Sequence, residues 1–144
     1  MGGMAFRWMI LVIVAASVIE LNDATEDPFS TQNTVVVKNL LSINKNLKVH
    51  CRSKDNDLGV RILTSLHNAY VFHFDDNMFG TTLFWCNVWH GRNFEHHQVF
   101  EAYKAKWYTR FSQLYAWEAR DNGIYFGHNE QVPVFKYAWD VPHK

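Results

Sequence analysis

Two cysteines are the residues of this chain with the most defined chemistry. Cys51 lies in the segment LKVHCRS and Cys86 in the segment TTLFWCNVW, and in both segments apolar and polar residues alternate as in a half-buried strand. Two thiols in paired strands form a disulfide in an oxidising compartment and stay reduced in the cytosol. The sequence favours a disulfide, which would stabilise the fold by about 3–4 kcal/mol. A pair of reduced core cysteines is the alternative.

Histidine is the second candidate for chemistry, since three of the eight histidines fall in the polar segment His90–Gln98. A zinc site needs three or four ligands that converge at about 2.0–2.3 Å. His96 and His97 are adjacent, and adjacent residues of an extended segment point to opposite sides. We therefore predict no metal and no cofactor. A small metal-dependent hydrolase built on these histidines is the weakest of the functional hypotheses.

The acidic turn after Cys51 resembles a calcium loop only in part. Asp55, Asp57 and Gly59 fit such a loop, but Val60 replaces the glycine required at the sixth position and Leu66 the glutamate at the twelfth. We interpret the two aspartates as turn formers that bind backbone N–H groups, with Gly59 at a positive φ. No nucleophile elbow occurs in the sequence. The chain is thus predicted not to be an enzyme.

The first residues resemble a secretory signal peptide. Arg7 precedes an apolar run from Trp8 to Ile19, which contains at 15–17 small residues of the kind that a signal peptidase accepts. A membrane anchor is the alternative, but a spanning helix needs roughly 20 apolar residues. We predict a signal peptide in residues 1–24, cleaved between about 17 and 24, and one domain over 25–144. The expected product is secreted, extracellular and not inserted in a membrane.

The charge balance excludes some partners. The chain has 14 basic and 14 acidic residues, so no basic excess is available to neutralise phosphates, and nucleic acid is not an expected partner. Aromatic residues make up 16% of the chain. Most of them are expected in the core, although exposed tryptophans such as Trp85 and Trp89 could stack on sugars.

The elements that position these residues are short strands. Apolar residues recur with a period of two, and turn residues separate the segments every eight to twelve residues, which favours an all-β, small antiparallel β-sandwich. Asn122-Gly123 between apolar runs predicts a hairpin. A short helix competes with strand only in 102–114. The expected strands are 34–39, 47–52, 60–63, 70–74, 82–88, 99–103, 114–119, 124–127 and 135–139.

Five segments in order, VVVKNL, LKVHCRSKDNDLG, YVFHF, TLFWCNVW and AWEARDNGIY, resemble the plant self-incompatibility protein family, also called the S-protein homologues. The resemblance implies a small secreted β-sandwich that acts as an extracellular ligand, as the pistil ligands of this family signal to pollen. Members commonly carry four cysteines. Here Tyr115 stands where the fourth is expected, so Cys51–Cys86 would be the remaining bridge, and Phe111, Tyr115 and Trp117 would pack the late hairpin.

The resemblance implies cell–cell signalling through a plasma-membrane receptor protein, with the chain acting as a monomer. A secreted carbohydrate-binding module that uses exposed tryptophans is the alternative. Loops are the expected recognition surface, because loop changes leave a sandwich intact. Polarity selects the turn 75–80 and the segment His90–Gln98 as candidates. The candidate recognition residues in that segment are His90, Arg92, Asn93, Glu95, His96 and His97.

Overall fold

The computed structural model describes residues 30–107 and 112–141, and the described residues from 31 onward belong to one compact unit. The predicted signal peptide in residues 1–24 lies outside the described residues. So does residue 111, which was expected to pack the late hairpin. In the described part of the chain, no helix has the length and apolar character needed to cross a membrane.

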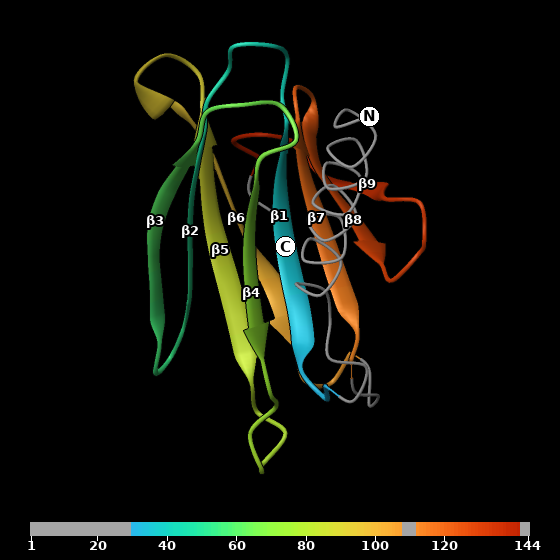
Figure 1. Ribbon diagram of the computed structural model, residues 1–144. Coiled ribbons are helices and arrows are strands. Elements are labelled where there is room, and N and C mark those ends of the chain that lie inside the picture. The colour runs from blue at the N-terminus through green and yellow to red at the C-terminus, as the bar shows by residue number, and fades with distance from the viewer. Residues whose placement is uncertain (1–29, 108–111, 142–144) are drawn as a thin grey trace, which may run out of the picture. The chain divides into compact units, whose positions relative to one another are not determined.

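Within the described residues, nine strands form two sheets that pack face to face (Figure 1). The five-stranded sheet has the order β4 (Ala69–Phe74), β1 (Asn33–Leu40), β7 (Leu114–Arg120), β8 (Gly123–His128) and β9 (Val134–Tyr137). The four-stranded sheet has the order β3 (Asp57–Leu63), β2 (Leu47–Ser53), β5 (Leu83–His90) and β6 (His96–Lys104). The predicted all-β sandwich is confirmed.

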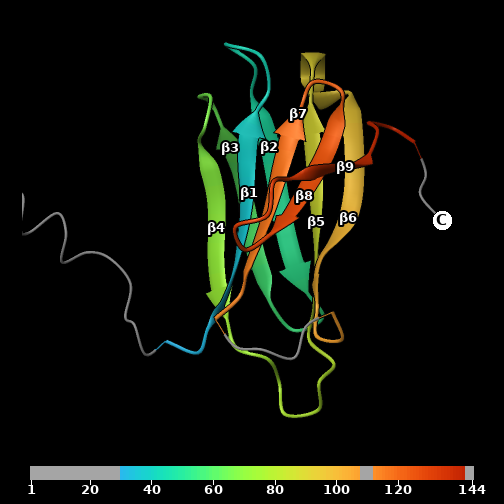
Figure 2. The same cartoon turned by 90° about the vertical axis from the view of Figure 1, so that its right-hand side faces the viewer.

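One strand pair departs from the antiparallel pattern. β1 and β7 run parallel, with Thr34 opposite Leu114 and Leu40 opposite Arg120, and Figure 2 shows their arrows pointing the same way. The other strand pairs among the described residues are antiparallel. The parallel pair places the first and seventh strands together at the centre of the larger sheet, which joins the start of the domain to its late hairpin.

Alternation along the strands builds the core. In β1 and β5 every second side chain is buried, as the period-two pattern predicts. Cys51 in β2 and Cys86 in β5 lie directly opposite each other and form the predicted disulfide. Tyr115 and Trp117 are buried on β7, and the Trp117 indole Nε1 donates to the carbonyl of Ala102 at 3.0 Å. Aromatic packing thus fills the region of the late hairpin.

Two predicted boundaries are wrong. The segment His90–Gln98 is not one loop: His90 ends β5, residues 96–98 begin β6, and only 91–95 connect them, with a short 3₁₀ turn η1 (Arg92–Phe94). Pairing of β5 with β6 extends to His90 opposite His96, because backbone groups pair whatever the polarity of their side chains. Residues 57–59, predicted as turn, begin β3.

Candidate functional site

The aspartate turn after Cys51 is held by hydrogen bonds. His50 Nε2 lies 2.7 Å from Asp57 Oδ1, and the same oxygen accepts the Gly59 N–H at 2.9 Å. The bond to His50 and then the bond to Gly59 lower the pKa of Asp57. Gly59 has a φ of 84°, a conformation that favours glycine. These contacts connect β2 to β3.

The three histidines of the segment 90–98 lie on two faces of the sheet. His90 is buried on the inner face, and the His96 ring stacks on it, with His96 Nδ1 2.6 Å from an Asp140 carboxylate oxygen. His97 lies on the outer face, 2.8 Å from the Asn87 side-chain oxygen. Within residues 30–107 and 112–141, no three His, Cys, Asp or Glu side chains are grouped so that they could hold a metal ion.

The β5–β6 turn has a constrained backbone. Gly91 has a φ of 87°, and a Cβ built on it would lie 2.8 Å from His96 Cδ2. Asn93 and Phe94 also have positive φ, which is uncommon for residues other than glycine and for a bulky aromatic costs about 1–3 kcal/mol. The Phe94 N–H donates to the Gly91 carbonyl at 3.0 Å. Three residues of the turn thus have positive φ, and a backbone hydrogen bond closes it.

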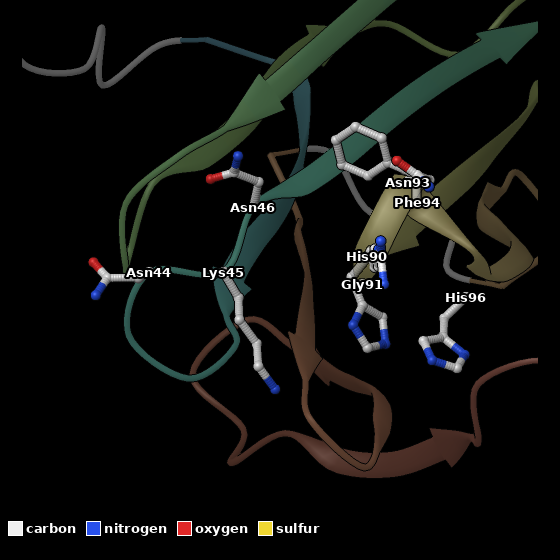
Figure 3. Close-up of a pocket in the computed structure, with 9 residues that line it drawn as sticks. Asn44, Lys45, Asn46, His90, Gly91, Asn93, Phe94 and His96 are labelled. Atoms are coloured by element: carbon white, nitrogen blue, oxygen red, sulfur yellow. The ribbon is translucent and has the colours of Figure 1, made fainter.

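A cavity of about 620 Å³ lies between this turn and the β1–β2 connection. Residues 44–46 of that connection line one side, and residues 90–94 and 96 line the other. Figure 3 shows Lys45 extending along one side of the cavity while the rings of His90 and His96 lie on the facing side. We refer to it below as the Lys45–His90 cavity.

His90 is the buried polar residue of the cavity. Its side chain is 8% exposed, and neither ring nitrogen has a hydrogen-bond partner among the described groups. The ring packs edge-on against Trp139, with centroids 4.1 Å apart, and stacks on His96 at 5.0 Å. Burial, and after it the charges of His96 and Lys45, lower the pKa of His90. His90 is therefore neutral at pH 7, with one N–H donor and one free acceptor.

Asp121, in the turn between β7 and β8, holds the opposite wall of the cavity. Its Oδ1 accepts the Ser42 N–H at 3.1 Å and lies 3.3 Å from Lys45 Nζ, and its other oxygen accepts the Ser42 hydroxyl. The bonds from Ser42 and then Lys45 lower the pKa of Asp121. Buried Asn39 fixes the same connection, since its amide donates to the Lys45 and Leu63 carbonyls.

The second candidate loop lies at the other end of the sandwich. The β4–β5 loop and the β5–β6 turn leave opposite ends of β5 (Figure 1). Asn77 organises the loop, because its side-chain oxygen accepts the N–H groups of Phe79 and Thr81 at 3.2 and 2.9 Å. Met78 and Phe79 are 96% and 85% exposed. The two candidate recognition loops thus form two separate surfaces.

Lysine and arginine side chains lie near the rings of the two outward-facing tryptophans of β5, Trp85 and Trp89. The Lys48 ammonium lies 4.8 Å from the Trp89 ring centre, and the His97 ring stacks on Trp89 at 5.1 Å. The Arg52 guanidinium lies 5.4 Å from the Trp85 ring. Both indoles are half-buried on the face away from the disulfide, as the alternation predicts. A neighbouring side chain thus contacts each of the two indole rings.

From the sequence we predicted neither that Lys45 lines the cavity nor that the His90 side chain is buried on the inner face of β5. His90 shares the parity of Cys86 and Val88, so the period-two pattern could have placed it inside. No local signal indicates that Lys45 lies across from it. The structure brings His90, Arg92, Asn93 and His96 to the cavity, but Glu95 and His97 do not line it.

Comparison with known proteins gives a consistent result. The family model of the plant self-incompatibility protein S1 matches residues 34–139. The chain is 36% identical over 138 residues to S-protein homolog 11 of Arabidopsis thaliana, covering 94% of this chain and 91% of that protein. It is 41% identical over 117 residues to S-protein homolog 21 of the same plant, covering 78% and 86% of the two chains.

A solved structure has the same architecture. It is an SPH (self-incompatibility protein homologue) protein, one of a widespread family of small, highly stable, secreted proteins from plants. The TM-score is 0.65 at 27% identity, and the match covers 78% of this chain and 98% of that chain. The likeness therefore extends over nearly the whole of the solved domain.

Proposed function

Since the chain belongs to the plant self-incompatibility protein S1 family, we propose that it is a non-enzymatic ligand that binds a receptor protein on the surface of a plant cell. The chain is a secreted plant protein, as the family is. Signalling between cells, export by a signal peptide in residues 1–24 and action as a monomer are parts of the proposal.

The backbone conformation of the turn 91–95 supports our proposal that the recognition surface lies there. Three of its residues have positive φ, and the backbone is closed by hydrogen bonds. A turn closed by backbone hydrogen bonds has less backbone freedom to lose on binding. Arg92 and Asn93 are exposed on it, beside a cavity lined by cationic and amide side chains. Such a surface suits a protein partner with polar, acidic groups.

The carbohydrate-binding alternative has less support. A sugar-binding surface needs a flat, accessible aromatic face. On β5 the Trp89 ring already contacts Lys48 and His97, and Trp85 lies beneath Arg52. Binding a sugar there would first break these contacts.

Protoplasts and purified cell walls separate the two functions. Fluorescently labelled protein, expressed from the full chain and collected from the medium, should bind saturably to protoplasts of one cell type. Protease treatment of the protoplasts should abolish the binding. Saturable binding to purified walls alone would instead support the carbohydrate-binding alternative, and the absence of saturable binding to any protoplast would refute the receptor proposal.

A pair of matched variants locates the surface. Arg92→Ala with Asn93→Ala changes the exposed turn, while Met78→Ala with Phe79→Ala changes the exposed loop at the opposite end. We expect the first variant to lose protoplast binding and the second to keep it. The reverse result would move the recognition surface to the β4–β5 loop.

A further inference from the structure

The four residues that follow β9 fasten the end of the described chain to β6. Residues 138–141 bond to the start of β6, an edge strand of the four-stranded sheet, and Figure 2 shows them in red beside it. The Asp140 N–H donates to the His97 carbonyl at 2.9 Å, and an Asp140 carboxylate oxygen accepts the His97 N–H at 2.6 Å. The Gln98 amide donates to two carbonyls of the segment, at 2.9 and 2.8 Å. We call residues 138–141 the C-terminal latch.

Trp139 joins this latch to the other sheet. Its indole Nε1 donates to the carbonyl of Arg120, the last residue of β7, at 2.8 Å. Its ring packs edge-on against the ring of His90, the last residue of β5, with centroids 4.1 Å apart. The C-terminal latch therefore connects β6 of one sheet to β7 of the other, and the contact between Trp139 and His90 lies within that connection.

His90 has no counter-charge of its own while the latch is closed. Both ring nitrogens are buried, and neither has a hydrogen-bond partner in the part of the chain that the structure describes. The charged or titratable groups that face the ring are His96 on β6, Lys45 on the β1–β2 connection, Asp121 on the β7–β8 turn and Asp140 on the latch. The two carboxylates are already paired, Asp121 with Lys45 across the Lys45–His90 cavity and Asp140 with His96. A proton taken up by His90 would therefore create a buried charge without a partner, which strongly destabilises the closed form.

We propose that the C-terminal latch is proton-sensitive: it stays closed over neutral His90 and opens more readily when His90 binds a proton. Opening moves Trp139 away and lets water reach the imidazole ring. Burial first, and then the charges of His96 and Lys45, lower the pKa of His90 in the closed form, so the open form binds the proton more readily. Acid therefore favours opening, and the effect should appear below about pH 6.5, where a solvated histidine titrates.

One contact of the latch has the opposite dependence on pH. His96 Nδ1 lies 2.6 Å from an Asp140 carboxylate oxygen, so a proton on His96 strengthens the closed form. The two side chains are 45% and 44% exposed, and an ion pair this exposed changes an equilibrium by at most about fivefold. Exclusion of the proton from closed His90 changes the opening constant by up to about thirtyfold between about pH 7.5 and 5.0. We therefore expect a net increase in opening of about sixfold to thirtyfold.

Hydrogen exchange measured by NMR tests the latch on the isotope-labelled, secreted full-chain product. The Asp140 amide N–H and the Trp139 indole N–H report the latch, because both are bonded in its closed form. The Trp117 indole N–H, which is bonded to the Ala102 carbonyl in the core, reports global unfolding. Protection factors of the latch groups, corrected for intrinsic exchange, should fall about sixfold to thirtyfold from about pH 7.5 to 5.0. Low guanidinium concentrations should lower the protection of Trp117 and leave that of the latch unchanged.

Two results with the wild-type protein would overturn the proposal. A change in latch protection below about twofold between the two pH values would show that opening is not linked to proton uptake. Latch groups whose protection equals that of Trp117 at every guanidinium concentration would show that the latch opens only when the whole domain unfolds. Either result stands without any variant.

Matched histidine variants then assign the effect to one ring. His90→Gln removes the titrating group and should abolish the fall in latch protection on acidification. His73→Gln is the control, since His73 lies on β4 with its Nδ1 2.8 Å from the Thr34 hydroxyl, and it should retain the full fall. A fall that persists in His90→Gln would overturn the assignment. Hydrogen exchange involves no receptor, so the latch is tested independently of the protoplast assay and of the proposed function.

Discussion

Replacing Asn39 with alanine removes the side chain that fastens the β1–β2 connection to the sandwich. Asn39 is fully buried at the end of β1. Its amide nitrogen donates to the Lys45 carbonyl at 3.1 Å and to the Leu63 carbonyl at 3.0 Å, and its oxygen accepts the Leu41 N–H at 3.0 Å. One side chain thus satisfies three backbone groups, two in the β1–β2 connection and one in β3.

The expected loss of stability follows from these three bonds. The Leu63 carbonyl and the Leu41 N–H lie in buried bonds, whereas the bond to the Lys45 carbonyl is only partly buried. A buried backbone group left without a partner costs about 1–3 kcal/mol, so the two together cost about 2–6 kcal/mol. Water entering the vacated space restores part of this. We expect Asn39→Ala to lower the free energy of unfolding by about 3 kcal/mol.

Guanidinium denaturation followed by tryptophan fluorescence measures this loss, because Trp117 is buried in the core and reports global unfolding. Asn46→Ala is the matched control. Asn46 lies on the same connection and is exposed, so its truncation should change stability by less than about 0.5 kcal/mol.

A loss of stability below about 1 kcal/mol, or one equal to that of Asn46→Ala, would refute the reasoning, because it would mean that the three backbone groups find other partners.

Three further predictions concern the disulfide, the cavity and its turn. Cys51→Ala with Cys86→Ala opens a link between residues 35 apart and should cost about 4 kcal/mol in the same denaturation assay, and a cost below about 1 kcal/mol would contradict it. Because burial lowers the pKa of His90, the unfolded chain binds this proton first, so stability should fall as pH drops below about 6.5, the unfolded value. His90→Gln should reduce that pH dependence of the unfolding free energy, and an unchanged slope would refute the assignment. Gly91→Ala should destabilise the protein by about 1–2 kcal/mol because of its positive φ and the close approach of His96, and a change within about 0.5 kcal/mol would show that the turn adapts.

The local alternation of apolar and polar residues was sufficient to predict most of the strands. Alternation in 34–39 and around Cys51 and Cys86 identified strands whose inner faces are buried in the structure, and Asn122-Gly123 identified the β7–β8 hairpin. The pattern failed where polar residues continue a strand. His96 to Gln98 are polar but pair with β5, since main-chain hydrogen bonding extends a hairpin beyond its apolar part.

The chain by itself determined the fold class, the two cysteines of the disulfide and the family, because these depend on residue type and short-range spacing. Only the tertiary structure decided which strands are neighbours, including the parallel pair β1 and β7. It alone set the two candidate loops at opposite ends of β5 and Lys45 across a cavity from His90. The physical reason is that such contacts join segments far apart in sequence. They form when two sheets bury their apolar faces together, and the local residue pattern does not determine which distant segments then meet.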